Sequence, residues 1–131
     1  TLSGNPIAMA AGLKTMELIS QPGFFEGLNQ KMSRLVDGLN AAAKKAGVPF
    51  CARALGGLGG MYFRATPPNN FEEATAQDLD AYKRFYHLML DGGVYLPPSH
   101  VEAFFLSGAH SDEDIAQTLA VAEKAFAALA A

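Results

Sequence analysis

The sequence has no tryptophan, a single cysteine and no apolar run near the ~20 residues that a membrane-spanning helix needs. One thiol, Cys51, excludes an internal disulfide and fits a reducing compartment. Basic residues are also few, with ten Lys and Arg scattered along a chain of net charge −3. The chain therefore has no concentrated positive surface for nucleic acid or an anionic membrane. Because no signal-peptide pattern is present either, the sequence predicts a soluble, cytoplasmic protein.

The chain is nevertheless rich enough in apolar residues to form a core. Half of its 131 residues are hydrophobic and 18% are charged, which is ordinary for a globular protein. The length predicts one domain, and a chain of this size buries roughly two-thirds of its unfolded surface if it folds alone. A piece of a larger protein would instead expose the surface that the remainder covers.

The chain opens on Thr1-Leu2-Ser3-Gly4-Asn5-Pro6 without an initiator Met, like a motif cut through its middle. Asn5 followed by Pro6 is a helix-entry signal, because Asn caps free N–H groups and Pro gives up a donor that lacks a partner anyway. A Thr hydroxyl and free N–H groups ahead of a helix favour an anion. The opening predicts half of a phosphate site whose other half lies outside the chain.

Residues 6–20 predict a helix with apolar residues on one face and small residues on the other. The small face consists of Ala8, Ala10, Ala11 and Gly12. Such a face lets another backbone approach closely, either inside this domain or in a part of the protein that is absent. In the second case we expect the helix to be displaced, disordered or used in a crystal contact.

The remaining pattern predicts helices around a small sheet. Residues 24–46 predict a long amphipathic helix, Thr75 with Asp78 predicts the start of a helix that runs to 91, and Ser111 predicts the cap of the last helix. Strands are expected over 50–55, 61–65, 94–96 and 104–106, with a turn at 56–60 and a loop at 66–70. The expected fold class is α+β, with a small antiparallel sheet and helices packed on one face.

The common catalytic patterns are not complete in this chain. The glycines at 56–60 lack the Lys-Ser/Thr ending of a phosphate loop and do not open a helix, so they indicate a turn. His87, His100 and His110 share no metal-ligand spacing with Cys51 or with one another, so no metal site is predicted.

Lysine chemistry is not indicated either. Lys14 and Lys83 lie on predicted amphipathic helices beside polar residues. A lysine that forms a Schiff base is activated by desolvation, and neither position suggests it.

The loop at 96–105 is the better functional candidate. It holds Glu102 between apolar residues and just ahead of a predicted hydrophobic strand. Composition alone favours an exposed loop acid. The alternative is a carboxylate held in a partly dry pocket, where it would bind a substrate amine.

Two blocks of the chain resemble the glutamate-1-semialdehyde 2,1-aminomutase family. The first is the opening at 1–6 with the Ala-rich helix after it, which alone would also fit related class III aminotransferases. The second comprises Gly92-Gly93-Val94-Tyr95-Leu96-Pro97-Pro98-Ser99, Glu102-Ala103, Ser107-Gly108-Ala109-His110 and the acid-capped helix that follows. This second block is more particular to the aminomutases.

The resemblance implies the C-terminal part of a fold-type I pyridoxal-phosphate enzyme. Residues 1–22 would link to a large domain, and residues 23–131 would form the C-terminal small domain. The whole enzyme would be a homodimer that converts (S)-4-amino-5-oxopentanoate, glutamate-1-semialdehyde, into 5-aminolevulinate for tetrapyrrole biosynthesis. It would use pyridoxal or pyridoxamine phosphate, which is not expected to bind this part alone.

The resemblance also implies roles for individual residues. Thr1 would contact the cofactor phosphate held by the partner subunit, and Glu102 and Ser99 would bind substrate. The lysine that carries the cofactor would lie upstream, so no catalytic residue is expected here and this part alone should be inactive. Two alternatives stay open, namely the C-terminal domain of another class III aminotransferase and a non-catalytic interaction module.

Overall fold

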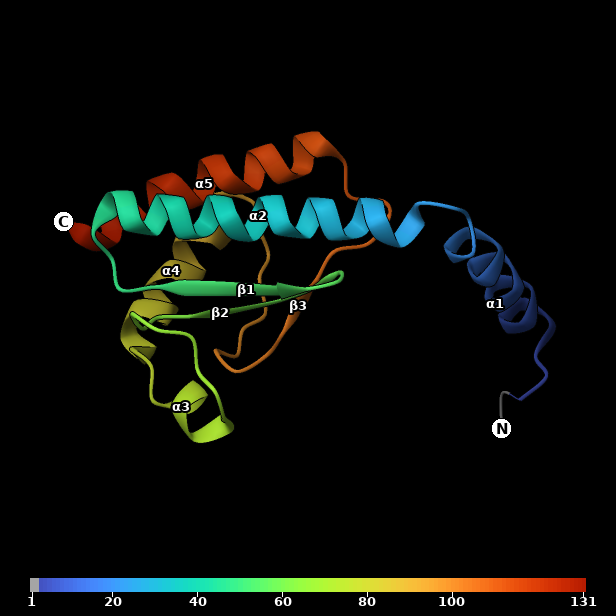
Figure 1. Ribbon diagram of the computed structural model, residues 1–131, viewed down its shortest axis with the longest axis horizontal. Helices are drawn as coiled ribbons and strands as arrows, with labels where there is room; N and C mark the ends of the chain where they lie inside the picture. The colour runs from blue at the N-terminus through green and yellow to red at the C-terminus, as the bar shows by residue number, and fades with distance from the viewer. Residues whose placement is uncertain (1–2) are drawn as a thin grey trace.

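The computed structural model describes residues 3–131, so Thr1 and Leu2 lie outside the described residues. Along this range the chain forms helices α1 to α5 and strands β1 to β3 (Figure 1). Their bounds are α1 Pro6–Ile19, α2 Phe24–Ala46, β1 Cys51–Leu55, β2 Leu58–Tyr62, α3 Phe71–Thr75, α4 Leu79–Asp91, β3 Phe104–Phe105 and α5 Asp112–Ala130. Residues 23–131 pack together and are called the body below.

The body is built on a three-stranded antiparallel sheet of order β1-β2-β3. A two-residue turn at Gly56–Gly57 joins β1 to β2, and Leu55 pairs with Leu58 where the hairpin closes. Helices α2 and α5 run side by side above the sheet, while α3 and the loop that leads into β3 lie below it (Figure 1). The expected α+β class with a small antiparallel sheet is confirmed.

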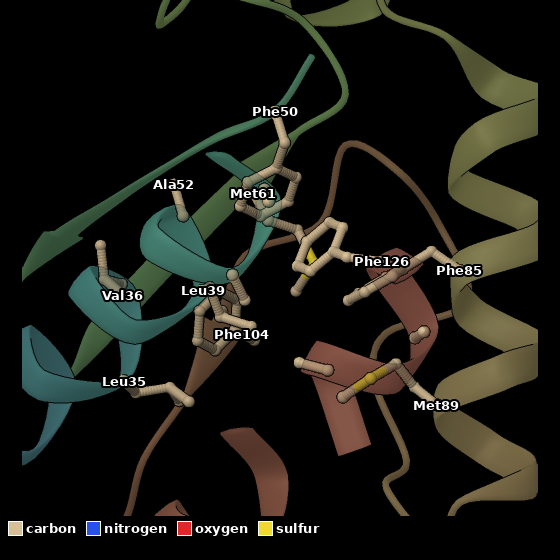
Figure 2. Close-up of a cluster of buried hydrophobic side chains, with 14 of the residues drawn as sticks. Leu35, Val36, Leu39, Phe50, Ala52, Met61, Phe85, Met89, Phe104 and Phe126 are labelled. Atoms are coloured by element: carbon tan, nitrogen blue, oxygen red, sulfur yellow. The ribbon is translucent and has the colours of Figure 1, made fainter. Parts of the chain in front are cut away.

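The core lies between the sheet and helices α2, α4 and α5. Phe50, Phe85 and Phe126 meet there, with ring centroids 4.6 Å apart for Phe85–Phe126 and 4.9 Å for Phe50–Phe126. Figure 2 shows these rings converging with Met61 from β2 and Met89 from α4. Burial of such large apolar side chains is the main source of the body's stability.

The long helices begin and end where their local signals predict. Helix α2 has the predicted bounds and stops at Gly47, whose φ of 73° is left-handed. Helix α5 starts at the Ser111 capping box, in which the Ser111 N–H donates to Asp114. That hydrogen bond holds the pKa of the Asp114 carboxyl below its ordinary value, because it favours the charged form. In residues 3–131, no helix is long and apolar enough to cross a membrane.

The prediction of one helix starting at Thr75 is wrong. Asn70 caps a separate short helix, α3, by accepting from the Glu73 N–H at 2.8 Å. The Thr75 hydroxyl donates to the Glu72 carbonyl and caps nothing. Asp78 is itself the N-cap of α4, because its carboxylate accepts from the Ala81 N–H.

Two strand predictions are also wrong. Strand β2 covers Leu58–Tyr62 rather than 61–65, so Gly59 and Gly60 belong to the strand and not to the turn. A Cβ on Gly59 would lie 2.3 Å from the Phe104 ring, so the bare backbone is what lets β3 pack there. Residues 94–96 form no strand, because the Val94 N–H donates back to Met89 and completes the end of α4.

Helix α1 stands away from the body (Figure 1). Its start is as predicted, with the Asn5 side chain accepting from the N–H groups of Ile7 and Ala8 at 3.0 and 3.2 Å. None of its 14 residues is buried, and Ile7 is 81% exposed. This exposure agrees with the expectation that the helix packs against a part of the protein outside this chain, and its displacement stays a prediction.

Candidate functional site

The two faces of the sheet have opposite characters. Ala52 and Met61 pair across β1 and β2 and are buried against the helices. The next pair along the ladder, Arg53 and Gly60, faces the other way, because successive strand residues alternate. In the part of the chain that the structure describes, Arg53, Leu55 and Phe105 are exposed, whereas Cys51 is buried. The face opposite to the core is therefore open toward the hairpin end of the sheet.

The loop that leads into β3 borders this open face. The side chains of Tyr82 and Gln77 hold the loop in place through hydrogen bonds to its backbone. The Tyr82 hydroxyl donates to the Pro97 carbonyl and also lies 3.1 Å from the Ser99 carbonyl oxygen. The Gln77 amide donates to the His100 carbonyl at 3.0 Å, and its oxygen accepts from the Phe63 N–H. The loop is therefore tied both to α4 and to the end of β2.

Tyr82 is suited to hold this loop because it stays neutral. It is 3% exposed, and its pKa is raised to about 12. Burial is the main cause, since it disfavours the phenolate, and the negative charge of Glu102 adds to it. The hydroxyl thus remains a hydrogen-bond donor throughout the physiological range.

A pocket of about 470 Å³ lies where the open face meets this loop. Its volume falls within the roughly 300–1,000 Å³ typical of small-molecule sites. The lining includes Arg53, Leu58, Gly60, Tyr62, Val101 and Glu102. Two opposite charges and a phenol thus stand around an otherwise apolar hollow.

Glu102, the predicted substrate residue, lies in the wall of this pocket, and its side chain is exposed. Ser99 does not line the pocket in the described part of the chain and is half-buried behind it. Its carbonyl accepts from the Glu102 N–H at 3.2 Å. Ser99 therefore shapes the turn that presents Glu102.

Arg53 is a residue that sequence reasoning missed. The strand alternation from Cys51 to Leu55 places it opposite to the buried Ala52, but only the fold shows that this outer face borders the loop with Glu102. A Cβ on Gly60, which pairs with Arg53, would lie 2.7 Å from the Tyr62 hydroxyl oxygen. The side chain of Tyr62 therefore folds back over Gly60.

The predicted phosphate residue, Thr1, lies outside the described residues. The N-terminus of α1 has fewer free N–H groups for an anion than expected, because the Asn5 side chain already accepts from the Ile7 and Ala8 N–H groups. A phosphate at this end would depend on groups ahead of Asn5.

The Ser107–His110 segment, which is part of the second block of the sequence described above, forms a turn that is held by hydrogen bonds. His110 Nδ1 accepts from the Ser107 N–H at 3.0 Å, and the His110 carbonyl accepts from Lys31 at 2.6 Å. A hollow of about 430 Å³ lies beside this turn, bordered by residues 93–95 and the start of α5. These contacts join α2 to the turn before α5.

The two lysines lie in polar surroundings, as predicted, and the single thiol is buried. Cys51 is buried, and that burial raises the pKa of its thiol. Lys14 and Lys83 are exposed and pair with acids on their own helices.

Comparison with known proteins gives consistent results. A family model for class-III aminotransferases matches residues 1–126. A glutamate-1-semialdehyde 2,1-aminomutase of Laribacter hongkongensis (strain HLHK9) is 52% identical over 127 residues, which is 97% of this chain. The chain spans 30% of the length of that curated relative.

Solved structures agree on the fold. An omega-transaminase from Sphaerobacter thermophilus superposes with a TM-score of 0.78 at 20% identity, covering 96% of this chain and 28% of that one. A transaminase with PLP bound gives a TM-score of 0.75 at 21% identity, covering 95% and 28%.

Proposed function

The chain belongs to the class-III aminotransferase family, and we propose that the protein carrying it is a glutamate-1-semialdehyde 2,1-aminomutase. Such an enzyme converts (S)-4-amino-5-oxopentanoate into 5-aminolevulinate for tetrapyrrole biosynthesis. The observation that carries this proposal is the 52% identity to a curated aminomutase over 97% of the chain. The pocket that Glu102 lines supports it, because its volume and its charged lining suit a small charged molecule.

In this proposal residues 23–131 form the C-terminal small domain, and residues 1–22 link it to a large domain in a cytoplasmic homodimer. The surface of α1 supports a covered position in the whole enzyme. Ile7, Leu13 and Met16 are all more than half exposed. A helix that is apolar on most sides is normally buried against other protein.

The cofactor in this proposal is pyridoxal or pyridoxamine phosphate, which supplies an electron sink when bound. The described residues do not form its site by themselves, because no lysine lines the Glu102 pocket and the α1 amides are taken by Asn5. The lysine would come from another part of the polypeptide. Thr1 is proposed to contact the cofactor phosphate held by the partner subunit.

The substrate side of the site is proposed to belong to this chain. Glu102 would bind the amino group of the substrate as a charge-assisted hydrogen-bond acceptor. Ser99 would support it through the turn that its carbonyl closes, and Tyr82 and Gln77 would keep the loop in place.

The test uses the full-length natural protein that carries this sequence, loaded with its cofactor. We expect 5-aminolevulinate to form from glutamate-1-semialdehyde without an added amino donor. Glu102→Gln should raise KM by roughly 10- to 100-fold, the loss expected for one charged hydrogen bond. Glu123→Gln, an exposed acid on α5, is the control.

Two results would contradict the proposal. Activity only with an added amino donor would identify an ordinary class III aminotransferase. Absence of both activities from the full-length, cofactor-loaded protein would favour an interaction module.

A further inference from the structure

We propose that Gln77 is a positioning residue, which holds the loop with Glu102 at a fixed distance from the sheet and so sets the affinity of the pocket for the substrate. The identity of that substrate rests on the function proposed above. The assignment of Gln77 itself rests on its three hydrogen bonds, on the burial of the segment at one end and on the exposure of the segment at the other.

The side-chain amide of Gln77 joins three segments of the chain. Its oxygen accepts from the Phe63 N–H at 3.0 Å. Its nitrogen donates to the carbonyls of Ala74 at 2.7 Å and His100 at 3.0 Å, which uses both N–H groups of the amide. Every one of these bonds ends on backbone, so Gln77 fixes the course of the chain and not the rotamer of another side chain.

Two of the three bonds end beside residues that line the pocket. Phe63 directly follows Tyr62, and His100 precedes Glu102 by two positions. Tyr62 belongs to the wall formed by β2, and Glu102 to the wall formed by the loop. One amide therefore links the backbones of both walls, and its length sets their separation.

The sheet end of this link is rigid. Phe63 is 2% exposed, and its ring packs against Phe50 and Phe85 with centroids 5.2 and 5.4 Å apart. Its carbonyl accepts from the Asp78 N–H at 3.0 Å, so Gln77 and Asp78 take up both of its backbone groups. Gln77 is thus anchored to the core of the body.

The loop end of the link depends on hydrogen bonds, because residues 101–103 are exposed. Tyr82 holds the carbonyls of Pro97 and Ser99, and Gln77 holds that of His100. Of these three carbonyls, that of His100 lies nearest to Glu102 in the sequence. With little apolar burial to replace it, loss of the Gln77 bond should let the segment with Glu102 move.

Such movement would weaken binding without altering the chemistry. A group that is held in place before the ligand arrives loses less conformational entropy on binding. Glu102 is exposed, and its N–H donates to the Ser99 carbonyl, so its position follows that of the loop. Gln77 does not line the pocket in the described part of the chain, so it acts only through this placement.

The experiment uses the full-length, cofactor-loaded protein with Gln77→Leu, which removes all three hydrogen bonds at similar side-chain size. Gln77→Glu keeps an acceptor for the Phe63 N–H and loses both donors, so it preserves the core should Gln77→Leu fail to fold. Gln117→Leu, at an exposed glutamine on α5, is the matched control. Each Gln77 substitution is also combined with Glu102→Gln.

We measure KM and kcat with glutamate-1-semialdehyde, the Kd of 5-aminolevulinate, and amide hydrogen exchange of residues 96–106 and of α2. Both Gln77 substitutions should raise KM and Kd by roughly 3- to 10-fold, the loss expected for one hydrogen bond, with kcat little changed. In the Glu102→Gln background they should add almost nothing, because the carboxylate that they displace is gone. Exchange should become faster in residues 96–106 and stay unchanged in α2.

Three results would overturn the inference in a protein that forms 5-aminolevulinate. The first is a Gln77→Leu or Gln77→Glu variant with the KM of Gln117→Leu. The second is an equal rise of KM with and without the Glu102 carboxylate, since a merely structural role of Gln77 would act on both. The third is faster exchange in α2 together with the loop, which would indicate general loss of stability.

A wild type that forms no 5-aminolevulinate would overturn the proposed function instead. Hydrogen exchange then still tests Gln77, because it needs no substrate. Unchanged exchange of residues 96–106 in both Gln77 variants would show that this side chain does not hold the loop.

Discussion

Helix α1 is more apolar in sequence than the long helices of the body, yet none of its residues is buried. Met16 of α1 is 57% exposed, whereas Met89 of α4 is fully buried. The helix forms in both places because caps and spacing act locally. Burial differs because only the body supplies facing elements, so an apolar stripe indicates a need for a partner and not its presence.

The largest expected effect comes from a matched pair of methionines. Met89→Ala should lower the free energy of unfolding of the body by about 2–5 kcal/mol, because it leaves a cavity among buried side chains. Met16→Ala should change it by less than about 0.5 kcal/mol. Urea denaturation of both variants checks this. Equal losses would show that α1 is packed in solution and would break the comparison.

A second pair lies on α2. Asn40→Ala removes both hydrogen bonds to the Ala52 backbone at the edge of the sheet, and should lower the free energy of unfolding by about 2–3 kcal/mol. Asn29→Ala, an exposed asparagine on the same helix, corrects for helix propensity and should be near neutral. If the two variants unfold at the same urea concentration, Asn40 does not secure β1.

The third prediction concerns pH and the loop of the site. Because the pKa of Tyr82 is raised from 10.0 to about 12 in the fold, the unfolded chain loses this proton first as the pH rises. The resulting stability is complete below pH 10 and is lost as the pH rises from about 10 through 12, by roughly 3 kcal/mol in all. The Tyr82→Phe variant should not show this loss of stability at high pH, because it lacks the ionisable hydroxyl.

Comparing wild type with Tyr82→Phe at each pH isolates this group from the other tyrosines. Near pH 8 the wild type should be more stable by about 1 kcal/mol, the net value of one hydrogen bond. A difference that stays constant up to pH 12 would contradict the role given to Tyr82.

The smallest effect is expected at the helix caps. Ser111→Ala should lower the free energy of unfolding by about 1 kcal/mol, because α5 is part of the packed body. Asn5→Ala should leave that value unchanged and reduce only helical circular dichroism, since an isolated helix of this length is marginal in water. A cooperative loss in both variants would place α1 within the same folding unit.

Some residues of the candidate site could be predicted from the sequence, and others could not. Glu102 was found because an acid between apolar residues is a local irregularity in the sequence. Arg53 was not found, because an arginine in a strand is ordinary until its neighbours across the pocket are known. The supporting residues Tyr82 and Gln77 were missed for the same reason, since their partners lie far along the chain.

The sequence by itself determined the long helices, their caps and the antiparallel class, because these depend on residues a few positions apart. It did not place β2, whose bounds depend on how Gly59 packs against Phe104. Nor did it separate α3 from α4, whose starts depend on the separate caps Asn70 and Asp78. Only the tertiary structure decided which sheet face stays open, that α1 lacks cover in the described chain, and that Arg53 and Glu102 share a pocket. Those features arise from strand register and layer packing between distant segments, which no local spacing encodes.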